Sequence, residues 1–162
     1  MGYVGRIVGI VGGILTLVGC LLPWLTVSSS LESISVLGII VPPWLAMLAF
    51  IFGIIGLILV AIGKRGPAIG ALVMGILAFV FVIIEWMLLV VIASFAEGLV
   101  SGTGVTVTID YGVYVALVGA IILIIGSIMA MSEAKKAAAA PMMPGPMPPE
   151  PMMEEPPAPP ME

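Results

Sequence analysis

The sequence contains no histidine, asparagine or glutamine, and only one cysteine, among its 162 residues. Histidine is the commonest metal ligand and the usual proton carrier near neutral pH. A lone Cys20 forms no intramolecular disulfide, and without histidine neither it nor a serine has the usual base that activates a nucleophile. We therefore expect a protein that is not an enzyme and that holds neither a cofactor nor a metal ion.

Charged side chains are also scarce. They make up 9% of the chain, whereas apolar residues make up 62%. A soluble domain has about 25% charged and about 45–50% apolar residues, so this chain lacks the polar groups to cover its surface in water. Its expected partner is therefore a lipid bilayer. The net charge of −4 and the absence of a basic patch exclude nucleic acid as a partner.

Long apolar runs dominate what is present. A helix that crosses a bilayer needs about 20 mostly apolar residues, and four segments meet this requirement. The sequence therefore predicts an all-α integral membrane protein, an antiparallel four-helix transmembrane bundle within residues 1–132. The expected helices are residues 4–22, 44–63, 67–95 and 112–131, joined on the outer side by loops 23–43 and 96–111.

The basic residues predict the orientation. There are five of them, Arg6, Lys64, Arg65, Lys135 and Lys136. With four crossings all five lie on one side of the membrane, and the two outer loops contain no lysine or arginine. Positive residues collect on the cytoplasmic side of membrane proteins. We therefore expect a multi-pass protein of the cell membrane with its N- and C-termini in the cytoplasm.

The outer loops have the pattern of short strands. Val105, Val107 and Ile109 alternate with polar residues, and the glycine-containing residues 101–104 are typical of a turn before them. Residues 25–36 are rich in β-branched residues and serine. We expect the two outer loops to form one small extracytoplasmic β-sheet.

The composition changes at Glu133. Residues 141–162 contain ten of the fourteen prolines, half of the twelve methionines and four glutamates. Proline lacks an amide donor and resists helix and sheet formation. We expect residues 133–162 to be a disordered, acidic, proline- and methionine-rich cytoplasmic tail, which acts as a spacer or docks a cytoplasmic partner.

Small residues recur at helical spacing within the expected spans. In lipid, helices associate mainly through close backbone contact at such residues. One interpretation is that these stripes hold the monomer together; the other is that the stripe of the first helix mediates self-association. The candidate packing residues are Gly5, Gly9, Gly13, Gly53, Gly56, Gly75 and Gly119.

Glu85 is the single ionisable residue inside an expected span, and such residues are functional candidates because charge is costly in lipid. Counting from the 64–66 turn puts it about 27–30 Å up the helix, near the outer headgroups, where it reaches water. No basic residue lies on that side, so the carboxyl group is hydrated, protonated, hydrogen-bonded to Trp or Tyr, or matched by another subunit or a cation. Structural, partner-binding and ion- or proton-coupling roles all remain open.

Leu17-Val18-Gly19-Cys20 follows Arg6 and an apolar run. This pattern fits the consensus of a bacterial lipoprotein signal, which would mean cleavage before Cys20 and lipidation of its thiol. The residues that follow are apolar instead of the usual polar linker. Lipidation of Cys20 is therefore an open alternative to four intact spans.

Two resemblances follow from the motifs. Trp24 after the first helix, an extended first outer loop and a shorter second loop resemble the claudin-like tetraspan layout, although the first loop lacks the two cysteines of claudins. A closer similarity is to uncharacterised prokaryotic four-transmembrane-helix proteins with Leu-Pro-Trp after the first helix, here Leu22-Pro23-Trp24, and a glycine-rich opening of the last helix, here residues 112–120. This similarity implies the fold over about residues 5–131 and implies no activity.

The expected function is therefore a non-enzymatic one. We interpret the chain as an interaction, scaffold or accessory subunit whose partner is a second copy of itself or another membrane protein. The alternative is a small oligomeric channel or transporter that uses Glu85. A conduction path needs polar groups along its length, and the expected spans offer few: Thr16, Cys20, Glu85, Ser94 and Ser127.

Overall fold

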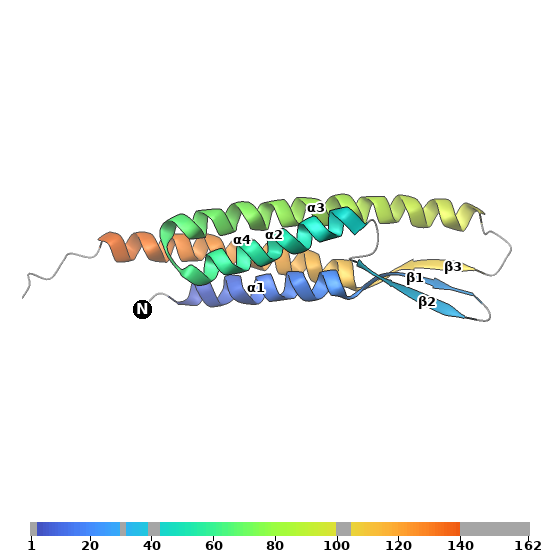
Figure 1. The fold of residues 1–162 in the computed structure, drawn as a ribbon, viewed down its shortest axis with the longest axis horizontal. Coiled ribbons are helices and arrows are strands. Elements are labelled where there is room, and N and C mark those ends of the chain that lie inside the picture. The colour runs from blue at the N-terminus through green and yellow to red at the C-terminus, as the bar shows by residue number, and fades with distance from the viewer. Residues whose placement is uncertain (1–2, 30–31, 39–42, 100–104, 140–162) are drawn as a thin grey trace, which may run out of the picture.

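The computed structural model describes residues 3–29, 32–38, 43–99 and 105–139. In these ranges four long helices lie side by side and a small sheet continues from one end of the bundle (Figure 1). We call this the sheet end, and the opposite end, where Gly63 and Lys64 join two helices, the turn end. The elements in order are α1 (Val4–Leu21), β1 (Pro23–Ser28), β2 (Ser33–Leu37), α2 (Pro43–Ile62), α3 (Arg65–Leu99), β3 (Thr106–Ile109) and α4 (Gly112–Ala139).

All four helices are long and apolar enough to cross a membrane. The bounds of α1 and α2 lie within one residue of the expected ones, and α4 begins at Gly112 as expected. Helix α3 is longer than expected at both ends. It begins at Arg65 because Pro67 falls in the first helical turn, where its missing amide proton costs no hydrogen bond.

The expectation that a disordered tail begins at Glu133 is wrong for its first seven residues. Helix α4 continues to Ala139, eight residues past the expected end of the apolar run. The added segment is rich in alanine, lysine and glutamate, which favour helix without being apolar. The end of the apolar run therefore predicts where the membrane crossing ends, and the helix itself continues further. The remainder of the expected tail, residues 140–162, lies outside the described residues.

The sheet joins the two loops, which confirms that part of the expectation. Its strand order is β2-β1-β3 and both pairings are antiparallel. Central strand β1 pairs Val27 with Ile34 of β2 and with Val107 of β3. The alternation read from the second loop holds, because Val107 is buried and its neighbours Thr106 and Thr108 are exposed. The expected turn at residues 101–104 lies outside the described residues.

Helices α1 and α4 pack backbone against backbone along their whole shared length. Gly12 meets the backbone of Leu123, Gly19 that of Ala116, and Gly126 that of Gly9. A Cβ atom at any of these glycines would overlap the facing main chain. Each of the two helices has a glycine at every seventh position: 5, 12 and 19 in α1, and 112, 119 and 126 in α4. Seven residues are about two helical turns, so each helix presents a glycine to the other on the same face at every second turn.

The candidate packing glycines are all buried within this one chain. Gly5 and Gly119 belong to the α1–α4 contact, and Gly9 and Gly13 face Val60 and Leu57 of α2. The other three, Gly53, Gly56 and Gly75, face side chains of α1 and α4. The stripe of the first helix is thus covered by the chain's own helices.

The Leu-Pro-Trp segment connects the bundle to the sheet. Pro23 begins β1 directly after α1, and the Trp24 indole folds back so that its Nε1 donates to the carbonyl of Gly19, at 2.7 Å. Trp24 is fully buried against Gly38 and Gly112, where a Cβ atom would overlap the indole ring. One tryptophan therefore fixes the end of α1, the start of α4 and the base of β1.

Candidate functional site

Glu85 lies on the buried face of α3, one turn from Val82 and one turn from Leu89. Those two residues belong to the apolar cluster at the sheet end, together with Cys20, Trp24 and Val107. The Glu85 side chain itself has 0% exposure. The expectation that it reaches water near the outer headgroups is therefore wrong, because residues of β1 and β3 pack against α3 and close this end of the bundle.

Both carboxylate oxygens of Glu85 are buried and have no hydrogen-bond partner among the described residues. The tryptophan donors expected from the sequence do not supply one. The Trp24 indole donates to Gly19, and Trp86 Nε1 is buried without a partner among the residues that the structure describes. Cys20, also fully buried, belongs to the same apolar cluster as Val82 and Leu89, the neighbours of Glu85 on α3. A buried carboxyl group without a donor is destabilising, which makes Glu85 the strongest candidate for a functional side chain in the described bundle.

Three hydroxyl side chains within the helices bond to the backbones of their own helices. The Thr16 hydroxyl donates to Gly12, that of Ser127 to Leu123 and that of Ser94 to Val90, at 2.7–2.9 Å. These bonds satisfy the hydroxyl groups locally. Among the described residues these three hydroxyl groups therefore supply no donor to Glu85.

The second half of α3 continues alongside the strands, past the ends of α1 and α2 (Figure 1). A helix of 35 residues is about 52 Å long, whereas the 18 residues of α1 span about 27 Å. Leu89 and Ala93 face the sheet and are buried. On another face, Met87, Val91, Phe95 and Leu99 recur every four residues and are 61–70% exposed. We call these four residues the α3 stripe.

At the turn end, Glu133 of α4 caps α1. Its Oε1 accepts a hydrogen bond from the Gly5 amide at 3.1 Å, in the first turn of α1, where Tyr3 offers no side-chain cap. A carboxylate at a helix N-terminus is favoured by the unpaired amides and the helix dipole. Glu133 thus ties the last helix to the first, across most of the sequence.

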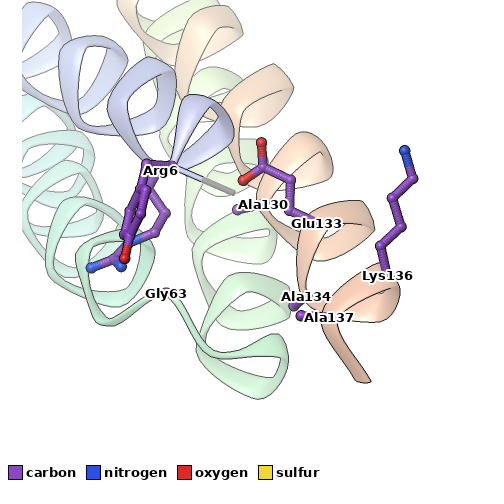
Figure 2. A pocket seen from close by; sticks show the side chains of 8 residues that line it. Arg6, Gly63, Ala130, Glu133, Ala134, Lys136 and Ala137 are labelled. Atoms are coloured by element: carbon purple, nitrogen blue, oxygen red, sulfur yellow. The ribbon is translucent and has the colours of Figure 1, made fainter. Parts of the chain in front are cut away.

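A pocket of about 620 Å³ lies beside this contact. Tyr3 and Arg6 line one side, and Glu133 and Lys136 line the other. Figure 2 shows Arg6 and Lys136 on opposite sides with Glu133 between them. The Arg6 guanidinium donates to the carbonyl of Ala61 and lies over the Tyr3 ring, 5.7 Å from its centroid.

Sequence reasoning identified Glu85 but missed two polar contacts between distant segments. One is the Glu133–Gly5 bond; the other joins the Thr26 hydroxyl of β1 to Asp110 Oδ2 at 2.6 Å. Glu133 was assigned to a disordered tail, and only the extension of α4 brings it to Gly5. Asp110 directly follows the alternating run of residues 105–109. That position indicates the end of a strand and could have predicted a role in the sheet.

The described residues contain no group of three or more Cys, Asp or Glu side chains placed to hold a metal ion. Cys20 is buried inside α1, and cleavage before it would remove the helix against which α4 packs. Comparison of the chain with protein families, curated proteins and solved structures finds no match.

Proposed function

We propose that this chain is a non-enzymatic, four-span protein of the cell membrane that presents a docking surface to another membrane protein. Both termini and the turn end lie in the cytoplasm, where the five basic residues collect, and the sheet lies outside. The second half of α3 packs against the sheet at that outer end. Its partner is another membrane protein or a second copy of the chain.

The α3 stripe is the observation that supports this proposal most directly. The helices α1 and α2 are long enough for one bilayer crossing of about 30 Å. The part of α3 that continues beyond them then projects from the hydrocarbon region with Met87, Val91, Phe95 and Leu99 exposed. A contiguous exposed apolar stripe outside lipid marks an interaction surface, and the buried face of the same segment packs on the sheet, so the stripe is held rigidly.

Paired serine substitutions test this proposal. We expect Val91→Ser with Phe95→Ser to remove a partner that the wild type retains in gentle-detergent purification from its native host, because two central anchors of the surface are lost. Mass spectrometry identifies the retained proteins. The matched control is Val73→Ser with Ile76→Ser, which changes two exposed apolar residues in the first half of the same helix. Equal retention by both double variants would contradict the proposal.

The unpartnered carboxylate of Glu85 favours a second candidate, a small oligomeric channel or transporter in which a cation supplies the missing partner. In this case Glu85→Leu abolishes ion or proton flux into liposomes that contain the purified protein. Glu85→Gln keeps the shape and the polar character without the charge, and separates charge from packing. Undiminished flux in both variants, or no flux in the wild type, counts against this candidate.

A further inference from the structure

The pocket at the turn end is lined by charged side chains. It lies at the opposite end of the bundle from the α3 stripe and has no part in the docking function proposed above. It lies between Tyr3 and Arg6 at the start of α1 and residues 130–137 of α4 (Figure 2). The alanines at 130, 134 and 137 form part of its wall, and their small side chains leave the space open. The chain therefore builds a cavity at the level where, in the proposed orientation, the inner-leaflet headgroups lie.

Arg6 is held in place before any ligand arrives. Its guanidinium donates to Ala61 and lies over Tyr3. The guanidinium also packs against Gly63, the residue that follows α2. Gly63 has a φ of 71° and no Cβ atom; a Cβ atom at this position would overlap the guanidinium. A guanidinium has five N–H donors, and within the described residues one of them forms a hydrogen bond. Because the Arg6 side chain is already held in place, binding a ligand through its remaining donors costs less side-chain conformational entropy than it costs an unrestrained arginine.

The carboxylate in the pocket is bonded to a backbone amide and forms no ion pair with Arg6 among the described residues. Glu133 directs Oε1 to the Gly5 amide, and its Oε2 is buried. Lys136 adds a second cation on the opposite wall and is exposed. Two cations and one carboxylate therefore line the pocket, so its side chains carry a net positive charge.

We infer that this pocket binds the phosphate of an anionic phospholipid from the inner leaflet, with Arg6 as the fixed donor and Lys136 as the mobile one. Basic pockets between transmembrane helices on the cytoplasmic side bind anionic headgroups, and arginine suits phosphate because it donates two parallel hydrogen bonds. The volume of about 620 Å³ accommodates a headgroup such as phosphoglycerol. This inference rests on the membrane orientation proposed above.

Native mass spectrometry of the full-length protein, released from nanodiscs of phosphatidylglycerol and phosphatidylcholine in equal amounts with identical acyl chains, tests the inference. The wild type is expected to retain one phosphatidylglycerol molecule in preference to phosphatidylcholine. Arg6→Gln and Lys136→Gln are each expected to lower that retention about tenfold, the effect of losing one charge-assisted contact. Lys136→Gln changes an exposed side chain, so it answers the question even if Arg6→Gln folds poorly.

Lys64→Gln is the matched control, because Lys64 is an exposed cation at the same end that does not line the pocket. Retention by Lys64→Gln equal to that of the wild type supports a defined site, whereas an equal loss in all three variants indicates diffuse attraction and overturns it. Complete displacement of the lipid by millimolar glycerol 3-phosphate would assign the site to soluble phosphate esters instead. A protein that enters the nanodiscs without preferring phosphatidylglycerol overturns this inference alone; one that does not enter them overturns the membrane proposal as well.

The acidic C-terminal segment is the competing occupant. Glu150, Glu154, Glu155 and Glu162 follow α4 in the sequence and are tethered close to its end. If the wild type retains no phosphatidylglycerol and the variant with all four glutamates changed to glutamine retains it, the segment is the occupant and the lipid assignment is wrong. Retention of phosphatidylglycerol by both proteins supports the lipid assignment.

Discussion

At the scale of single residues, two buried side chains of the sheet end have opposite effects on stability. Trp24 is fully buried with its indole nitrogen bonded to Gly19, so its polar atom is satisfied. Glu85 is equally buried, and within the described part of the chain neither of its carboxylate oxygens has a hydrogen-bond donor. A protein that keeps such a residue carries a destabilising group at a place where leucine would fit, and functional sites are where such conflicts are found.

Glu85→Leu is therefore expected to stabilise the protein. Removing a buried, unpartnered polar group relieves about 1–3 kcal/mol, and leucine has a similar volume. Reversible unfolding of the detergent-solubilised protein, followed by circular dichroism, measures the difference in free energy. Glu85→Gln is the control that keeps a polar group in place. A loss of stability in Glu85→Leu would show that the carboxyl group has a bonding partner in the folded protein.

The sequence predicted that Glu85 matters and did not predict its burial. Counting residues along one helix gives depth in the membrane, but exposure depends on what covers the helix. The residues that close the sheet end, Trp24 and Val107 among them, come from two separate loops. Their contact with α3 depends on the pairing of β1 with β3, which one sequence does not specify.

At the scale of elements, the contact between α1 and α4 is the closest in the bundle. Glycines repeating every seven residues on both helices let the two backbones meet without intervening side chains. Such contact maximises van der Waals packing, which is the main attraction between helices in lipid. The spacing of small residues predicted close packing between helices. Because every span has such residues, the spacing does not predict which helix packs against which.

Gly12→Ala tests this contact. The added Cβ would overlap the backbone of Leu123, and overpacking of this kind costs about 1–3 kcal/mol, although alanine favours helix by about 1 kcal/mol. We expect a net loss of stability in the same unfolding measurement. In the control Gly66→Ala, the added Cβ has no atom within 4 Å among the described residues, and stability should not fall. Equal stability of the two variants would contradict backbone contact between α1 and α4.

At the scale of the whole molecule, the basic residues lie at one end of the bundle and the sheet lies at the other. The five basic residues lie in the first turn of α1, at the junction of α2 and α3, and near the end of α4, and these positions meet at the turn end (Figure 1). The sheet and the α3 stripe lie at the opposite end. The long apolar runs predicted the helices and the alternating residues predicted the sheet. The projection of α3 past its neighbours and the extension of α4 were not predicted, because hydropathy records composition and not where a helix ends.

Labelling of single introduced cysteines on intact cells tests the central claim, the four crossings with the turn end inside. Cys20 is buried and serves as the unlabelled background. We expect a membrane-impermeant maleimide to label Ser35→Cys, on exposed strand β2, in intact cells, and to label Lys64→Cys, in the exposed turn between α2 and α3, only after the cells are lysed. Labelling of Lys64→Cys in intact cells would contradict the account.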